Sequence, residues 1–486
     1  MASFFELVNQ HRPDLTPFVE LYKHFHANPE LSNYEKETAA RVAEELRAIS
    51  SDFVIKTGIG GHGIAAILTN NSGPVVLLRA DMDALPVQEQ TSLPYASTKF
   101  MAVPASSSSS LDRSKEEEFV RKPVMHACGH DMHMTALLAA AKILVSARGA
   151  WSGALVLVFQ PAEERGTGAQ AMVDDGLYSS DRHGVPIPDV VVAGHVIPLR
   201  AGTVGTRRGI AATSADSMRV TLKGRGAHAS MPHAAVDPIV LAAHTVLRLQ
   251  SVVSRETDPA DSTCVTVASV RAGEAENVIP DRATLALDWR AISEVSRKRV
   301  GKRVREICRA ESRISWGEEE GIDNEVEGGG VGGGCSCHGS GGGITKNAPW
   351  EPDFEVTRAF PLTINDDAVL STLEERFRDH FGGYPDYGSG KAIPPESHYR
   401  YDADTPRLAA SEDFSILASA VGKPYCFFVY GGTDPLLMDD AVKKGRVAED
   451  IPINHSSKFA PVVMPTLRAG MEAYVIAALA FLKRAG

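Results

Sequence analysis

The residues best suited to chemistry lie in one short segment of the first half of the chain. Positions 126–133 read His-Ala-Cys-Gly-His-Asp-Met-His, so five side chains able to bind a metal or move a proton fall within eight positions. A thiolate and an imidazole two residues apart, here Cys128 and His130, can reach one metal ion from irregular backbone. The segment therefore predicts a metal site. A buried cysteine among polar residues that cap a helix is the alternative interpretation.

Other ligand-type residues stand at the ends of short apolar runs. Three runs of strand length lead into Asp83, into Glu163 and Glu164, and into His195. Open α/β sheets place their binding sites at the carboxyl ends of their strands. Adjacent side chains on an extended backbone point apart, so the two glutamates can serve a metal and the substrate separately. A solvated acidic loop or a core histidine explains each position alone, but their joint occurrence, with His455 late in the chain, favours a metal centre.

The elements that would position these residues follow from the spacing of apolar side chains. The first fifty residues have helical periodicity, and short apolar runs then alternate with helical patterns such as 135–147. This alternation predicts an α/β layer with a mostly parallel, buried central sheet. From about residue 209 the pattern changes to alternating strands with helices at 238–249 and 294–309. A small α+β domain inserted into the larger one is therefore expected.

The predicted boundaries are 1–208 and 368–486 for the larger domain, and 209–367 for the inserted domain. Two segments, 105–118 and 316–352, are serine-rich or glycine-rich and strongly polar. Such stretches cannot bury enough apolar area to offset the entropy lost on ordering, so we expect flexible insertions. The Cys-Ser-Cys-His run at 335–338 lacks the partner pair that a structural zinc site needs.

The composition excludes several classes of protein. The chain has 486 residues, of which 43% are hydrophobic and 23% charged, with a formal net charge of −11. These values are ordinary for a globular protein of two to three domains, and no basic face for nucleic acid is evident. The start lacks a signal-peptide pattern, and the apolar stretch 474–482 is shorter than the roughly 20 residues of a membrane span. With few cysteines, we expect a cytoplasmic protein that binds neither nucleic acid nor membrane.

Eight ordered motifs carry a family resemblance across nearly the whole chain, apart from the two insertions. They are RADMDALP (79–86), MHACGHDMH (125–133), FQPAEERG (159–166), GHV (194–196), GRGAHASMPH (224–233), NVIPD (277–281), SEDF (411–414) and NHSSKF (454–459). This set resembles the M20 metallopeptidase family, in particular its aminoacylase and amidohydrolase branch. That branch includes hippurate hydrolases and plant auxin-conjugate hydrolases.

The resemblance implies a zinc-peptidase-like α/β domain with an inserted ferredoxin-like lid. It also implies two divalent metal ions per subunit, with the ligands Cys128, His130, Glu164, His195 and His455. Glu163 would be the general base for a metal-bridging water, and Asp83 would orient a ligand imidazole. In the lid, His228 would polarise the scissile carbonyl, while Asn277 and Arg290 would bind the polar end of the substrate. The lid pairs two subunits in relatives, so a homodimer is expected.

These roles imply a metal-dependent amidohydrolase acting on N-acyl amino acids or related small conjugates. The thiolate of Cys128 favours zinc, whereas carboxylate and imidazole also suit manganese, so the metal stays open. Arg290 suits the carboxylate of an amino-acid product. Two other functions also stay open: an amidase with Cys128 as nucleophile and His130 or His126 as its base, and a conjugate-binding protein without turnover. We expect structural or orienting roles for His26, His133 and His233.

Overall fold

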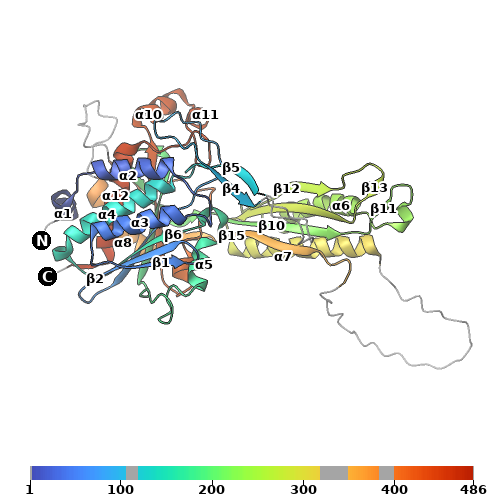
Figure 1. Cartoon of the computed structure of the whole chain (residues 1–486), viewed down its shortest axis with the longest axis horizontal. Helices are drawn as coiled ribbons and strands as arrows, with labels where there is room; N and C mark the ends of the chain where they lie inside the picture. Colours follow the sequence, from blue (N-terminus) through green and yellow to red (C-terminus); the bar gives the residue numbers. More distant parts are fainter. Residues whose placement is uncertain (1–2, 105–118, 318–347, 383–398, 485–486) are drawn as a thin grey trace, which may run out of the picture. The chain divides into compact units, whose positions relative to one another are not determined.

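The computed structural model describes residues 3–104, 119–317, 348–382 and 399–484, which divide into two compact units (Figure 1). The first unit comprises Met1–Thr213 and Phe360–Gly486, and the second comprises Ser214–Ala359. The insertion predicted at 105–118 lies outside the described residues, as does most of the one predicted at 316–352, including the run at 335–338.

A nine-stranded mixed sheet forms the centre of the first unit. Its strands are β1 (Val54–Ile59), β2 (Gly63–Asn70), β3 (Val75–Asp81), β6 (Trp151–Gln160), β7 (Val190–Arg200), β8 (Thr203–Gly205), β17 (Arg400–Asp402), β18 (Tyr425–Thr433) and β19 (Lys483–Arg484). The order is β1-β2-β6-β3-β7-β18-β8-β17, with β19 beside β6. The central strands β6, β3, β7 and β18 are parallel neighbours, whereas β1–β2, β2–β6 and β8–β18 are antiparallel. The predicted α/β class with a parallel sheet centre is confirmed.

Helices cover both faces of this sheet, because alternate residues of its buried strands point to opposite sides. Leu78 and Leu157 belong to the larger core cluster, while Leu77 and Val158 belong to the smaller one. The helices of the larger cluster are α1 (Phe4–His11), α2 (Thr16–Ala27), α3 (Lys36–Ile49), α4 (His130–Ser146), α8 (Asp367–Phe381) and α12 (Val463–Phe481). The smaller cluster includes α5 (Gly168–Asp174) and α9 (Ile416–Ser419).

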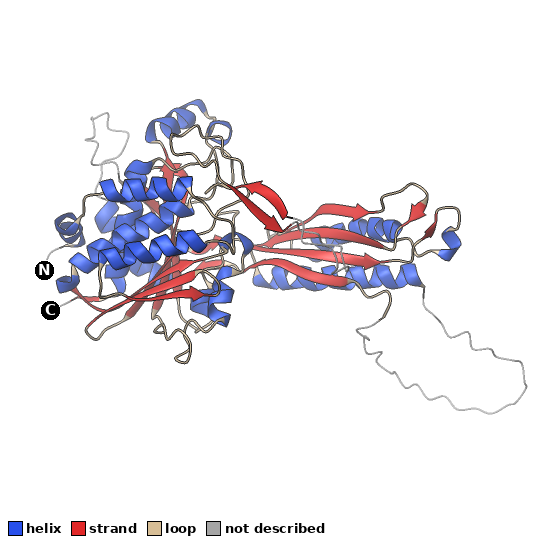
Figure 2. Ribbon diagram, viewed as in Figure 1, coloured by secondary structure: helices blue, strands red, loops and turns tan. Residues whose placement is uncertain are grey.

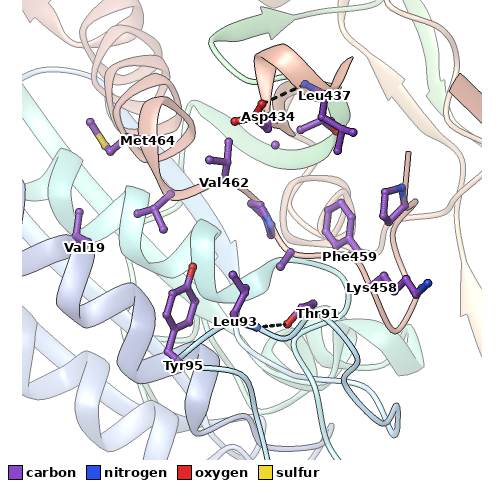
Figure 3. Close-up of a pocket in the computed structure, with 16 residues that line it drawn as sticks. Val19, Thr91, Leu93, Tyr95, Asp434, Leu437, Lys458, Phe459, Val462 and Met464 are labelled. Carbon is purple, nitrogen blue, oxygen red and sulfur yellow. Dashed lines mark hydrogen bonds between the residues drawn. The ribbon is translucent and has the colours of Figure 1, made fainter. Parts of the chain in front are cut away.

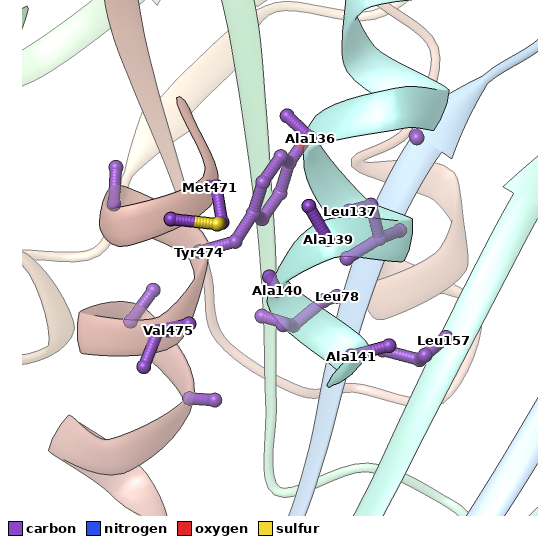
Figure 4. Close-up of a cluster of buried hydrophobic side chains, with 14 of the residues drawn as sticks. Leu78, Ala136, Leu137, Ala139, Ala140, Ala141, Leu157, Met471, Tyr474 and Val475 are labelled. Carbon is purple, nitrogen blue, oxygen red and sulfur yellow. The ribbon is translucent and has the colours of Figure 1, made fainter. Parts of the chain in front are cut away.

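The helices α4 and α12 pack against each other in the larger core cluster (Figure 4). Both helices are apolar on nearly all sides, as expected of helices that have no solvent-facing stripe. The small side chains of Ala136 and Ala140 let α12 approach closely. Tyr474 on α12 then reaches the sheet, where its hydroxyl donates to the carbonyl of Arg79 at 2.9 Å and accepts the N–H of Gly194 at 3.3 Å. The core thereby fixes the backbone of β3 shortly before Asp83 and the backbone of β7 directly before His195.

The second unit has a four-stranded sheet with two helices on one side (Figure 2). Its elements in chain order are β10 (Ser214–Lys223), β11 (Ala227–His228), α6 (Pro238–Ser251), β12 (Cys264–Ala272), β13 (Val278–Ile279), β14 (Arg282–Ala291), α7 (Glu294–Trp316) and β15 (Asp353–Phe360). The spatial order β12-β14-β10-β15, with one helix after each of β10 and β14, is the ferredoxin-like arrangement that the resemblance implied.

The predicted start of the insertion at residue 316 is wrong, because Trp316 still belongs to α7. The indole Nε1 of Trp316 donates to the carbonyl of Lys223 at 2.9 Å, which anchors the last turn of the helix. The strands β9 (Gly209–Ala212) and β16 (Thr363–Asn365) pair with each other in the first unit. The remaining elements of that unit are the paired strands β4 (Phe100–Pro104) and β5 (Phe119–Pro123), and the helices α10 (Pro435–Lys444) and α11 (Val447–Asp450). Across the described ranges, no helix combines the length and apolarity needed to cross a membrane.

Candidate metal centre

The candidate site lies where neighbouring strands of the first unit meet the start of α4. Parallel pairing aligns Asp81 at the end of β3 with Gln160 at the end of β6, and Arg79 with Ala193 on β7. The end of β3 therefore has His195, on β7, on one side and Glu163, shortly after β6, on the other. The first turn of α4 brings His130 to the same place. The sequence analysis expected these residues to converge, but it placed His195 at the end of a strand, whereas β7 continues to Arg200.

The side chains proposed as ligands lie close together. The Sγ of Cys128 is 3.5 Å from Nε2 of His195. The Oε1 of Glu164 is 3.3 Å from Nε2 of His455 and 3.8 Å from Nε2 of His130. Three groups each have ligand atoms within 4.8 Å of one another: Cys128, Glu164 and His455; His130, Glu163 and Glu164; and Asp81, His130, His133 and His195. Such spacings suit atoms that each contact a shared ion at about 2.0–2.3 Å.

The site passes an independent test for a cation. Nε2 of His130 and Oε1 of Glu164 are buried and have no hydrogen-bond partner among the described residues. Buried polar atoms are seldom left unpaired, because they have lost water and gained nothing in exchange. A cation between them would satisfy both. The donor set of one thiol, imidazoles and carboxylates also fits zinc or manganese.

Two neighbouring histidines differ in what their ring nitrogens contact. Nδ1 of His195 donates to the carbonyl of Val196 at 2.7 Å, which leaves the lone pair of Nε2 available. Burial, together with the nearby His133, holds the pKa of His195 well below its usual value, so the imidazole is neutral, as a metal ligand must be. In contrast, His133 uses both nitrogens: Nδ1 lies 2.5 Å from Asp81 Oδ1, and Nε2 accepts the N–H of Val196 at 2.8 Å. His133 therefore orients its neighbours and has no free lone pair for a metal.

Asp83 holds the turn that carries the two glutamates. Its Oδ1 accepts the N–H of Glu163 at 3.1 Å, and its Oδ2 accepts the N–H of Glu164 at 3.0 Å and the hydroxyl of Ser32 at 2.6 Å. Oδ1 also lies 3.3 Å from Nδ1 of His130. Burial would raise the pKa of Asp83, but these contacts outweigh it and lower the pKa. Asp83 can thus align both a ligand imidazole and the backbone of the glutamate turn.

The expectation that Glu163 and Glu164 stand on extended backbone, with side chains pointing apart, is wrong. Both lie in a single 3-10 turn, Glu163–Arg165, which begins after Ala162 at a φ of 49°. This left-handed residue bends the chain away from β6. As a result both carboxylates approach the same Nε2 of His130, at 3.9 Å for Glu163 and 3.8 Å for Glu164.

Glu163 has the electrostatic surroundings of a base. Burial is the main reason that its pKa lies well above the usual value, and the carboxylates of Glu412 and Glu164 raise it further. A carboxylate with a raised pKa holds an accepted proton better than an ordinary one, which a general base requires. Burial likewise raises the pKa of the Cys128 thiol, with Glu164 and Glu163 adding to the effect. A bound cation would reverse this, because coordination ionises a thiol.

The sequence analysis missed a buried ionic network behind the site. The guanidinium of Arg79 is fully buried and contacts Asp81 at 2.6 Å, Gln160 at 2.9 Å, Glu412 at 3.2 Å and Asp413 at 3.5 Å. A signal was present: an arginine that ends an apolar strand needs a buried counter-charge. The adjacent acids of the SEDF motif supply it, but their position beside β3 follows from the fold alone.

A second buried network fixes the first turn of α4. Nδ1 of His26 lies 2.6 Å from Oδ2 of Asp131, and its Nε2 lies 3.0 Å from Oε1 of Glu89. Burial opposes a charged imidazole here, but the two carboxylates outweigh it and raise the pKa of His26 to about 9. The resulting bridge ties α2 to the helix that begins with His130.

The residues predicted to contact substrate lie in the second unit. His228 is on β11, where its Nδ1 is 2.7 Å from the hydroxyl of Ser230. Asn277 lies beside it, because β11 pairs with β13 and the carbonyl of Asn277 accepts the N–H of Ala229 at 3.0 Å. Arg290 is on β14, with Nε 3.4 Å from Oδ1 of Asp288. The unit thus brings His228 and Asn277 together, while Arg290 belongs to a different sheet.

A hollow of about 480 Å³ lies beside the loop that carries His455 (Figure 3). Apolar side chains such as Leu93, Phe459 and Val462 make up most of its wall, together with Tyr95. None of the proposed metal ligands lines it, so this hollow is distinct from the metal centre.

Comparison with known proteins identifies the family. The model of peptidase family M20/M25/M40 matches residues 77–439. This chain belongs to that family. Three curated relatives of the M20 chain are hippurate hydrolase of Campylobacter jejuni (39% identical, covering 60% of this chain and 69% of the relative), N-acetyl-L-cysteine deacetylase of Bacillus subtilis (36%, 59% and 62%) and IAA-amino acid hydrolase ILR1-like 4 of Arabidopsis thaliana (30%, 84% and 76%).

Solved structures agree on the fold. A protein from methicillin-resistant Staphylococcus aureus has a TM-score of 0.71 at 24% identity, over 99% of this chain and 100% of that one. The Bacillus subtilis YXEP protein, a dinuclear metal binding peptidase from the M20 family, has a TM-score of 0.61 at 22% identity, over 96% and 98%. The predicted family is confirmed. The M20 chain is a metal-dependent amidohydrolase that binds divalent metal.

Proposed function

We propose that this M20 hydrolase cleaves the amide bond of N-acyl amino acids or related small conjugates. The observation that carries the proposal is the buried cluster of a thiol, imidazoles and carboxylates beside Glu163, in which two buried polar atoms have no hydrogen-bond partner among the described residues. The three relatives are named for hippurate, N-acetyl-L-cysteine and IAA-amino acids. An amino acid acylated on nitrogen is common to these names. The alignments cover 69%, 62% and 76% of those relatives, so the substrate class is transferred as a proposal.

The proposed metal centre holds two divalent ions. Its ligands are Cys128, His130, Glu164, His195 and His455. The Sγ of Cys128 lies near Nε2 of His195 and shares a ligand group with Glu164 and His455, so its thiolate would help to hold the ions. When bound, the ions would polarise the substrate carbonyl and lower the pKa of water. Zinc is favoured by the thiolate, and manganese is the alternative.

The protein side chains divide the remaining chemistry. Glu163 takes a proton from the attacking water and passes it to the leaving nitrogen as the C–N bond breaks, which gives a carboxylic acid and a free amino acid. Asp83 keeps the glutamate turn and His130 aligned. His228 stabilises charge on the carbonyl oxygen, and Asn277 and Arg290 bind the carboxylate of the amino acid.

The structure weakens the case for Cys128 as a nucleophile. A nucleophilic cysteine needs a lowered pKa, whereas burial and two neighbouring carboxylates raise the pKa of Cys128. Its Sγ lies within hydrogen-bond distance of His195, whereas a thiol mechanism was expected to use His130 or His126.

We further propose a cytoplasmic homodimer that pairs through the second unit. Several large apolar side chains of that unit are exposed, namely Ile239, Val240, Leu247, Val270 and Val278. Exposed apolar residues beside an edge strand such as β12 favour an interface. The described cysteines are free thiols, in keeping with a reducing compartment.

The test is a hydrolysis screen of N-acetyl, N-benzoyl and indole-acyl amino acids, measured as kcat/KM together with metal content. We expect turnover by the parent, loss on treatment with chelator and recovery with zinc or manganese. Activity that survives complete metal removal would overturn the metal mechanism. A metal-loaded parent that binds these conjugates without cleaving any of them would favour a binding protein instead.

A further inference from the structure

The SEDF motif contains a buried carboxylate to which the proposed function gives no role. Glu412 is 4% exposed and lies between the metal centre and the Arg79 network. We propose that Glu412 is an additional protein ligand, which binds through Oε1 the ion that His195 holds through Nε2. This inference rests on the proposed metal centre and extends its ligand set by one carboxylate.

The geometry around His195 supports a shared ion. Oε1 of Glu412 is 3.6 Å from Nε2 of His195, the nitrogen left free when Nδ1 donates to the carbonyl of Val196. Atoms that each contact one ion at about 2.1 Å are separated by about 3 Å to at most about 4 Å. The Sγ of Cys128 is 3.5 Å from the same nitrogen. Cys128 and Glu412 thus each place a ligand atom near the free nitrogen of His195, and Glu412 is near enough to share an ion with it.

The charges behind the site give a second argument. The single guanidinium of Arg79 faces three buried carboxylates, those of Asp81, Glu412 and Asp413. Buried charges are costly unless they are paired, so this group has an excess of negative charge that a cation would balance. The carboxylate of Glu412 is the one that faces both ways: its Oε2 contacts Arg79 at 3.2 Å, and its Oε1 contacts the metal-facing nitrogen of His195.

The neighbouring Asp413 provides a matched control. It is also buried and contacts the same guanidinium, at 3.5 Å. However, its oxygens accept hydrogen bonds from Nε2 of Gln160 at 2.6 Å and from the N–H of Ala169 at 3.1 Å. Its carboxylate is therefore satisfied by the protein. Neutralising Asp413 removes a charge from the Arg79 network without removing a proposed ligand.

The experiment compares Glu412→Gln and Asp413→Asn with the parent. Each protein is equilibrated against fixed free zinc, and bound metal per chain is measured, with circular dichroism to verify folding. We expect Glu412→Gln to lose about 10-fold to 100-fold or more in affinity for one of the two ions, the loss that even groups behind a ligand cause. Asp413→Asn should keep both affinities. In the cobalt-loaded form, the d–d absorption of Glu412→Gln should change while the thiolate-to-cobalt band of Cys128 remains.

If Glu412→Gln binds both ions as tightly as the parent does, the inference is overturned, while the proposed function stays intact. An equal loss in Asp413→Asn would also overturn it, since the effect would then come from the charge around Arg79. A parent that binds no metal at all would instead refute the proposed function. If Glu412→Gln does not fold, Glu412→Asp replaces it: a retained but shortened carboxylate should still lower the affinity of one ion only, and unchanged affinity would contradict the inference.

Discussion

At the scale of single residues, the second contact of a side chain decides what it can do. The rings of His133 and His195 are 4.3 Å apart, and both lie in the buried centre. Nδ1 of His195 donates to a backbone carbonyl, which leaves the lone pair of Nε2 available. In His133 both ring nitrogens have partners, namely Asp81 and Val196. Two histidines that look equivalent in the sequence are thus a candidate ligand and an orienting residue.

Mutation should distinguish the roles of the two adjacent glutamates. Glu163→Gln removes the proposed base, so we expect kcat to fall by about 10²–10⁴-fold while metal content stays at the parent level. Glu164→Gln removes a proposed ligand and should lose metal as well as activity. Steady-state kinetics and metal analysis on the same preparations distinguish the two. Equal metal loss in both variants would contradict the assignment of Glu163 as base.

At the scale of elements, the backbone before α4 leaves no room for a side chain. Gly129, between Cys128 and His130, has a φ of 86°, and a Cβ there would lie 2.4 Å from Cγ1 of Val196. We expect Gly129→Ala to destabilise the protein by roughly 2–4 kcal/mol, from backbone strain and overpacking, and to weaken metal binding.

Gly61→Ala is the control for backbone strain alone. Gly61 has a φ of 109°, but nothing lies within 4 Å of its Cβ position. This variant should lose only about 1 kcal/mol, within the range for a strained residue, and keep its metal affinity. Urea unfolding and metal titration measure both quantities. Identical behaviour of the two variants would show that the contact with Val196 does not matter.

The bridge from α2 to α4 should make stability depend on pH. The pKa of His26 is raised from 6.5 to about 9 in the folded chain, so its stabilising contribution is complete below pH 6.5 and is lost as pH rises through 9. Its partners Asp131 and Glu89 have lowered pKa values, although burial opposes this, so their contribution is lost only in acid.

We therefore compare the parent with His26→Gln at constant metal concentration. The melting temperature of the parent should exceed that of the variant most at pH 5.5–6.5, and the gap should close towards pH 9.5 as His26 loses its proton. Groups that titrate equally in both proteins cancel in this difference. A gap that is constant from pH 6 to 10 would show that His26 is not charged in the folded state.

A structural feature can be predicted from the sequence when it depends on residues that are close together in the chain. Helices such as α6 and α7 follow from local spacing and were predicted. The convergence of strand ends follows from the general behaviour of parallel sheets. The contact between Arg79 and Glu412 joins residues 333 positions apart, so no local pattern reveals it. The 3-10 turn at Glu163 also escaped prediction, because it depends on one left-handed residue, Ala162, held by its neighbours.

At the scale of the whole molecule, the two units carry different parts of the proposed reaction. All of the proposed ligands and Glu163 belong to the first unit, whereas His228, Asn277 and Arg290 belong to the second. Mutation of the second unit should therefore leave metal content unchanged. His228→Ala should lower kcat by about 10²–10³-fold, the effect of losing one donor to a developing oxyanion, with both ions still bound.

If the subunits of the proposed homodimer exchange His228, two inactive variants should restore each other. A subunit with Glu163→Gln keeps His228, and a subunit with His228→Ala keeps Glu163, so a mixed dimer has one complete site only when His228 serves the partner. Each mixed dimer would have one of its two sites complete, so a sample that contains only mixed dimers should show about half of the parent's activity. Dimers mixed by co-expression and purified through two different tags measure this directly. A mixed dimer as inactive as the two single variants would show that each His228 serves its own subunit.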